Sequence, residues 1–197
     1  MALAALLALK NGKRTGVVTT DVLSGATPMV FSAHYNDRDA SAELLASAAN
    51  SGVNLFISTT KECSAFVDKS GNAYESIANI ENISESQSNY VIGGYSISAS
   101  ASSMSASSSA VAFDKAVSEA LEYLSKDPDG FVLMAEGARI DKAGHNSDFN
   151  QMFTGVGNGV PTKEENNKFG CVGSIASVVF MLPLAVSAYI LRKKKEN

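Results

Sequence analysis

Three residues in one short stretch of the chain have the types and the spacing that metal chemistry needs. Glu136 directly follows the apolar run FVLMA, and Asp141 and His145 come next, four residues apart. On a helix, residues four apart share a face, so this acid and this imidazole would point the same way. A carboxylate with an imidazole suits zinc, whereas a carboxylate with oxygen donors suits magnesium. A solvated turn also contains such residues, and spacing alone favours that plainer interpretation.

The elements that position these side chains follow from the hydrophobic pattern. Three short apolar runs, at 16–20, 52–57 and 131–135, predict buried strands. Because these runs alternate with helical segments, they predict an α/β fold whose parallel sheet is covered on both faces. Crevices in such sheets form beyond the carboxyl ends of the strands, which is where Glu136 would lie.

The helices between these strands are predicted from composition and spacing. Residues 41–50 have helical composition, and 113–124 show apolar residues at helical spacing with charges between them. Thr27 and Pro28 resemble a helix start with proline at the first position. The N-terminal MALAALLALKNGKR reads as an amphipathic helix that leads into a strand.

Composition limits the classes of protein to consider. The chain has 197 residues, is 45% hydrophobic and carries a net charge of −4, so it can hold one domain with a core and lacks the basic surface of a nucleic-acid binder. Its two cysteines, Cys63 and Cys171, allow one disulfide but no cysteine-based zinc site. We expect both thiols to be unreactive.

The C-terminal third predicts a membrane anchor. Residues 171–191 form an uncharged, mostly apolar segment that is long enough to cross a bilayer. A buried core helix is the alternative. The basic tail 192–197 predicts a cytoplasmic C-terminus and a globular part, 1–150, outside the membrane. The Ser-rich stretch 96–110 is expected to be a mobile loop and 151–170 a polar spacer. No convincing export signal begins the chain, so we expect that it has lost its natural N-terminus.

Two motifs give these residues a family context. AEGARIDKAGH resembles the signature of the alkaline phosphatase family, and the upstream GVVTTDVLSGATPMVFSAHYNDRD is similar to a second segment of that family. The resemblance implies a three-layer αβα sandwich with a mostly parallel sheet, phosphate monoester substrates and frequent homodimers. It also implies zinc and magnesium as cofactors. Residue by residue, it implies that Thr27 and Glu136 bind magnesium, Asp141 and His145 bind zinc, and Arg38 grips the phosphate.

The chain also departs from the family pattern. No Asp-Ser-Ala nucleophile motif occurs in the sequence, the remaining zinc ligands are missing, and Gly25 stands where relatives carry Asp or His. The resemblance therefore predicts an alkaline phosphatase-type hydrolase present as a truncated chain that is inactive alone. A membrane-tethered, non-catalytic pseudoenzyme or binding module is the alternative. We expect Arg139 and Lys142 to face solvent and His34 to be structural.

Overall fold

A parallel β-sheet forms the centre of the molecule. The computed structural model describes residues 3–95 and 113–147. Every strand pair in the sheet is parallel, and the strand order is β3-β4-β2-β1-β5. The strands are β1 (Arg14–Thr19), β2 (Leu55–Thr59), β3 (Glu75–Ile77), β4 (Val91–Tyr95) and β5 (Phe131–Glu136). Because all run the same way, their carboxyl ends meet at one edge of the sheet.

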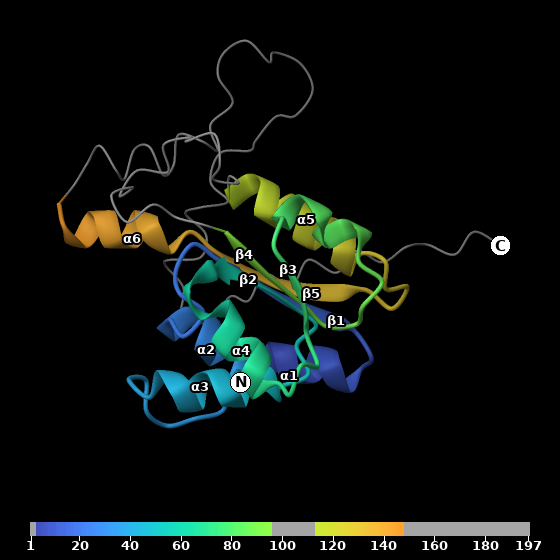
Figure 1. Cartoon of the computed structure of the whole chain (residues 1–197), viewed down its shortest axis with the longest axis horizontal. Coiled ribbons are helices and arrows are strands. Elements are labelled where there is room, and N and C mark those ends of the chain that lie inside the picture. The colour runs from blue at the N-terminus through green and yellow to red at the C-terminus, as the bar shows by residue number, and fades with distance from the viewer. Residues whose placement is uncertain (1–2, 96–112, 148–197) are drawn as a thin grey trace, which may run out of the picture.

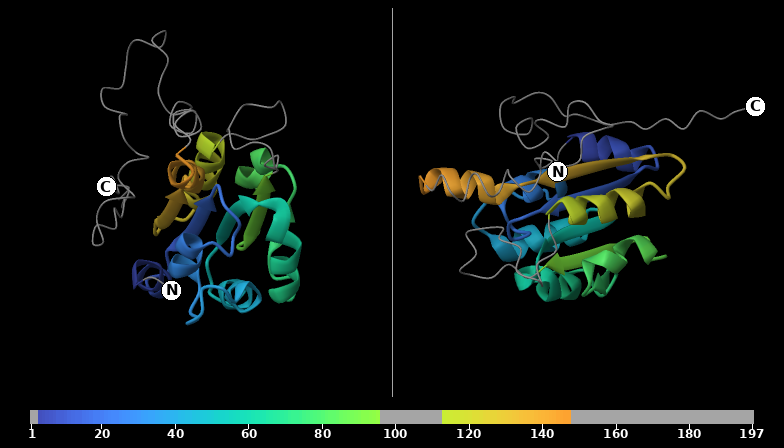
Figure 2. Two further views of the ribbon diagram at one scale, coloured as in Figure 1. Left: turned by 90° about the vertical axis from the view of Figure 1, so that its left-hand side faces the viewer. Right: turned by 90° about the horizontal axis from the view of Figure 1, so that it is seen from above.

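Helices cover both faces of this sheet, which makes three layers (Figures 1 and 2). Four helices lie on one face, and a longer helix with a 3₁₀ segment lies on the other. The first group is α1 (Leu3–Lys10), α2 (Ala26–Ser32), α3 (Ser41–Ala49) and α4 (Cys63–Lys69). The second is α5 (Phe113–Leu124) with the 3₁₀ helix η2 (Ile80–Glu85). The remaining elements are the 3₁₀ helix η1 (Thr60–Glu62) and the helix α6 (Ala138–His145). The predicted α/β fold is therefore confirmed.

Alternation along the strands separates two hydrophobic clusters. Val17 of β1 packs with the α1–α4 layer, whereas its neighbour Val18 packs with α5. On β5, Met134 belongs to the first cluster and Leu133 to the second. Successive side chains of a strand point to opposite faces, so the clusters fix which face each later residue of β1 and β5 addresses.

The predicted elements are mostly confirmed, with shifted ends. The strands predicted at 16–20, 52–57 and 131–135 are β1, β2 and β5, and the helices predicted at the N-terminus, at 41–50 and at 113–124 are α1, α3 and α5. The start predicted for α2 is wrong. This helix begins at Ala26 after an N-cap at Gly25, so Pro28 is its third residue rather than its first. Its missing N–H costs nothing there, because the first N–H groups of a helix have no partner within it.

Several predictions fall on residues outside the described ones. The loop at 96–110, the spacer at 151–170, the span at 171–191, the tail at 192–197 and Cys171 all do so. Within residues 3–95 and 113–147, no helix is long and apolar enough to cross a bilayer. Cys63 is free and buried, and burial raises the pKa of its thiol, in keeping with the unreactive role expected of it.

Candidate metal and phosphate site

Glu136 ends β5 at the carboxyl edge of the sheet, as predicted. It lies opposite Thr19, the last residue of β1. The Thr19 hydroxyl donates a hydrogen bond to Oε2 of Glu136 at 2.6 Å, and Thr19 Oγ1 accepts the backbone N–H of Asp21 at 3.1 Å. Thr19 is fully buried, while Glu136 is half-buried. A carboxylate that emerges from a sheet edge with one oxygen already held is well placed to bind a cation with the other.

Thr20, the residue directly after β1, holds the start of α6. The backbone N–H of Thr20 donates to the carbonyl oxygen of Glu136 at 3.0 Å, and its Oγ1 accepts the N–H of Arg139 at 3.2 Å. That N–H belongs to the first turn of α6, where backbone donors need a partner from outside the helix. Thr20 therefore caps α6 from a strand far away in the sequence.

Asp141 and His145 lie on α6 one turn apart, as their spacing predicts. Oδ2 of Asp141 is 3.4 Å from Nδ1 of His145, which is also 3.0 Å from the Asp141 carbonyl oxygen. Both side chains reach solvent, with 38% of Asp141 and 76% of His145 exposed. Nδ1 faces two acceptor oxygens and therefore carries the proton, which leaves Nε2 as the ring nitrogen that can bind a metal.

The described residues do not complete a zinc centre. Zinc in catalytic sites has three protein ligands, and no cluster of three or more His, Cys, Asp or Glu side chains occurs in the part of the chain that the structure describes. Asp141 and His145 therefore fit zinc only as part of a larger ligand set. Magnesium is less demanding, because it keeps several waters and needs one or two carboxylates, so Glu136 fits it.

Thr27 and Arg38 come from the helical layer beside this edge. Thr27 is exposed on α2, and α2 packs against both β1 and β5. Figure 1 shows α2 and α6 at the same end of the molecule. Arg38 lies in the loop between α2 and α3 with 80% of its side chain exposed, and its Nε is 3.9 Å from Asp39 Oδ1, the limit of an ion pair. Its guanidinium is thus available to an anion.

The structure brings some of the predicted site residues together more firmly than others. Glu136, Asp141 and His145 share the β5–α6 segment, whereas no hydrogen bond or ion pair joins them to Thr27 or Arg38 among the described residues. The solvent-facing position expected of Arg139 is wrong in part, because this residue is half-buried and its Nε is sealed from solvent. The side chain of Lys142 is outside the described part.

Sequence reasoning missed the two threonines that hold this segment. In the sequence they are simply the last two residues of the strand predicted at 16–20. A signal was present, because two hydroxyl residues in succession at the buried end of a strand need hydrogen-bond partners. Nothing in the sequence identifies those partners, which lie more than 110 residues further along the chain.

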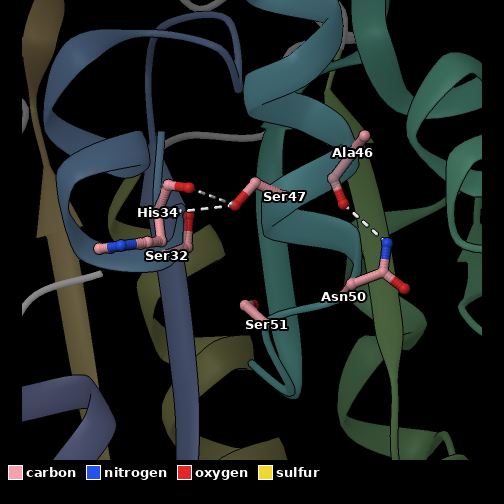
Figure 3. A pocket seen from close by; sticks show the side chains of 6 residues that line it. All are labelled: Ser32, His34, Ala46, Ser47, Asn50 and Ser51. Carbon is pink, nitrogen blue, oxygen red and sulfur yellow. Dashed lines mark hydrogen bonds between the residues drawn. The ribbon is translucent and has the colours of Figure 1, made fainter. Parts of the chain in front are cut away.

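A separate recess lies between α2 and α3, with a volume of about 510 Å³ (Figure 3). Two serine hydroxyl groups in this recess already form hydrogen bonds with the main chain. Ser47 Oγ accepts the N–H of His34 at 2.8 Å, and Ser32 Oγ donates to the Pro28 carbonyl at 2.7 Å. The His34 side chain is exposed, so only its main chain has the structural role expected of this residue. The recess is lined by Ser32, His34, Ala46, Ser47, Asn50 and Ser51.

Comparison with known proteins supports the family resemblance. Residues 69–157 match the family model described as alkaline phosphatase. That range includes Glu136, Asp141 and His145 but neither Thr27 nor Arg38. No curated protein matches the chain.

Several solved structures of alkaline phosphatases share this fold. The cold-active enzyme from the psychrophile Shewanella sp. is 24% identical with a TM-score of 0.64, over 78% of this chain and 39% of its own. The enzyme from the Antarctic bacterium TAB5 is 23% identical with a TM-score of 0.62, over 76% and 46%. A variant of the TAB5 enzyme with Mg bound in its M3 site is 21% identical with a TM-score of 0.59, over 76% and 46%. This chain therefore spans less than half the length of these structures.

Proposed function

We propose that this chain, whose resemblance to the alkaline phosphatase family is borne out by the family model and the fold, supplies part of the site of a phosphoric monoester hydrolase. The observation that carries the proposal is the β5–α6 segment. There a strand-end carboxylate, Glu136, is followed by the pair Asp141 and His145, whose facing atoms are 3.4 Å apart. The same segment falls within the residues matched by the family model.

Each site residue has a distinct role in this proposal. Glu136 and Thr27 bind magnesium, and Asp141 and His145 contribute two ligands to a zinc ion. When bound, such ions supply Lewis-acid stabilisation of the charge on phosphoryl oxygens. Arg38 grips the phosphate, because a guanidinium matches two phosphate oxygens at once. Its exposure of 80% leaves it free to do so.

The chain by itself is proposed to be catalytically silent. It contains no Asp-Ser-Ala motif to supply a nucleophile, and Asp141 with His145 make fewer than the three protein ligands that catalytic zinc requires. The span at 171–191 is proposed as a membrane anchor with the globular part outside, on the strength of its length and its basic flank. Dimerisation is proposed from the family resemblance alone.

Metal content measured on the purified full-length chain tests the proposal. After incubation with zinc and magnesium and removal of free ions, we expect bound magnesium that Glu136→Gln reduces, and bound zinc that His145→Ala reduces. His34→Ala is the matched control, because His34 is the chain's other histidine and is equally exposed to solvent. Zinc and magnesium contents that none of these variants change would contradict the proposal.

Turnover and phosphate binding test the other two parts. We expect no hydrolysis of an aryl phosphate by the full chain with both metals present, and weaker binding of inorganic phosphate by Arg38→Ala than by Asp39→Asn. Hydrolysis that disappears in Arg38→Ala would show the silent-chain proposal to be wrong. Absence of both metal and phosphate binding would instead favour the non-catalytic module.

A further inference from the structure

We propose that Thr19 is a positioning residue for Glu136. Its buried hydroxyl fixes one oxygen of that carboxylate and leaves the other for a divalent cation. The inference rests on the proposed magnesium site. It assigns a role to a residue of β1 that belongs neither to the β5–α6 segment nor to the loop that carries Arg38.

The direction of the hydrogen bonds around Thr19 is determined by its partners. The bond to Asp21 involves its backbone N–H, so Thr19 Oγ1 accepts it, and a carboxylate oxygen such as Glu136 Oε2 can only accept. The Thr19 hydroxyl proton is then directed to Glu136 Oε2, 2.6 Å away. Hydroxyl-to-carboxylate bonds of about 2.5–2.7 Å are charge-assisted and among the stronger hydrogen bonds in proteins. Oε2 is therefore held, and in the part of the chain described here no other hydrogen bond restrains Glu136's side chain.

Strand pairing makes this contact rigid. Thr19 and Glu136 are register partners on adjacent parallel strands, and Thr19 has no exposed surface. By alternation from Val17 and Met134, both side chains point to the α1–α4 face. That is the face on which α2, the helix that carries Thr27, packs against β1 and β5. Thr19 thus orients Glu136 toward the layer from which the second proposed magnesium ligand comes.

Thr20 provides a natural comparison, because it is adjacent and equally buried but has a different partner. Its Oγ1 accepts the Arg139 N–H at the start of α6 and does not contact the Glu136 carboxylate. Removing the Thr20 hydroxyl should weaken the cap of α6 and lower the stability of the protein. It should leave Glu136 Oε2 held by Thr19.

The test is a titration of the full chain with Mn²⁺, a paramagnetic substitute for Mg²⁺, followed by electron paramagnetic resonance. The Glu136→Gln variant defines the signal that belongs to Glu136. We expect Thr19→Val, which keeps the side-chain shape, to weaken this binding by about 10–100-fold, the usual effect of removing a partner of a metal ligand. Thr19→Ser, which keeps the hydroxyl, and Thr20→Val should bind Mn²⁺ like the wild type.

A second measurement needs no metal. In the presence of a chelator, urea unfolding of Thr19→Val, Glu136→Gln and the double variant forms a thermodynamic cycle. We expect the double variant to lose less stability than the sum of the two single losses, because Glu136→Gln replaces the charge-assisted hydrogen bond by a weaker neutral one and Thr19→Val removes the same bond. Should Thr19→Val fail to fold, Thr19→Cys, whose S–H group is a much weaker donor, replaces it in both measurements.

The possible outcomes separate this inference from the proposed function. If the wild type binds Mn²⁺ through Glu136 and Thr19→Val binds it equally well, the positioning role is refuted and the metal site stands. If the two losses of stability are additive, the proposed contact is refuted. If the wild type takes up no Mn²⁺ that Glu136→Gln removes, the proposed magnesium site fails and the positioning role fails with it.

Discussion

Replacing Gly94 by alanine should destabilise the fold, whereas the same change at the preceding Gly93 should be nearly neutral. A β-carbon on Gly94 would lie 2.9 Å from Cα of Thr60 and 2.8 Å from the Cys63 sulfur. Thr60 Cα is main chain and Cys63 is buried at the start of α4, so neither can move without shifting η1 and α4 against β4. On Gly93 the nearest atom, at 2.6 Å, is Cδ1 of Ile83, the end of a side chain that can rotate.

The magnitude follows from two opposing effects. Overpacking of a core costs about 1–3 kcal/mol. Alanine also restricts the unfolded chain, which stabilises the protein by about 0.4–1 kcal/mol relative to glycine. For Gly94→Ala the first effect wins and leaves a net loss of about 1–2 kcal/mol, a large share of a typical stability of roughly 5–15 kcal/mol. For Gly93→Ala, rotation of Ile83 relieves most of the clash, so the two effects nearly cancel.

Urea unfolding followed by far-ultraviolet circular dichroism measures this difference. The chain has no tryptophan, so the fluorescence of its six tyrosines is the second probe. Both variants should show the same dependence of free energy on urea as the wild type, with a lower midpoint for Gly94→Ala alone. Equal midpoints for the two variants, or a lower one for Gly93→Ala, would refute the reasoning that main-chain proximity decides the cost.

Three further predictions concern other polar groups whose hydrogen bonds or burial stabilise the fold. Tyr74→Phe should lower the free energy of unfolding by about 1–3 kcal/mol, as measured by urea unfolding. The reason is that the Val53 carbonyl, which accepts a hydrogen bond from the Tyr74 hydroxyl at 2.5 Å, would lose this donor. Burial raises the pKa of Tyr123 to about 12, so the unfolded chain, titrating near 10, releases its proton first. Stability should therefore fall from about pH 10 to about pH 12, and Tyr123→Phe should flatten the fall in an alkaline urea series. Glu62→Gln should loosen the β1–α2 connection, because Glu62 accepts both the N–H and the hydroxyl of Ser24 at 2.7 Å; faster amide hydrogen exchange at Ser24 would reveal it.

The elements that could be predicted from the sequence are those with a long, unbroken pattern. α5 has the predicted bounds because charges fall regularly between its apolar residues. β4 escaped prediction because Gly93 and Gly94 interrupt its apolar run, and these glycines are required by neighbours, Ile83 and Thr60, that come from other elements. β3 has only three residues and is largely exposed, so no burial pattern marks it. Tertiary packing, rather than local preference, determines both strands.

The candidate site divides in the same way. The pairing of Asp141 with His145 is a local property of a helix and follows from their spacing. The support of Glu136 is not local, since Thr19 precedes it by 117 residues and meets it only because β1 and β5 are neighbours. Successive strand residues point in opposite directions, so Thr19 and Thr20 can serve two different partners, a carboxylate and the first turn of a helix. Two adjacent threonines therefore do what one cannot. A shift of one residue in the β1–β5 register would turn both hydroxyl groups to the opposite faces, so Glu136 would lose its partner and α6 its cap together.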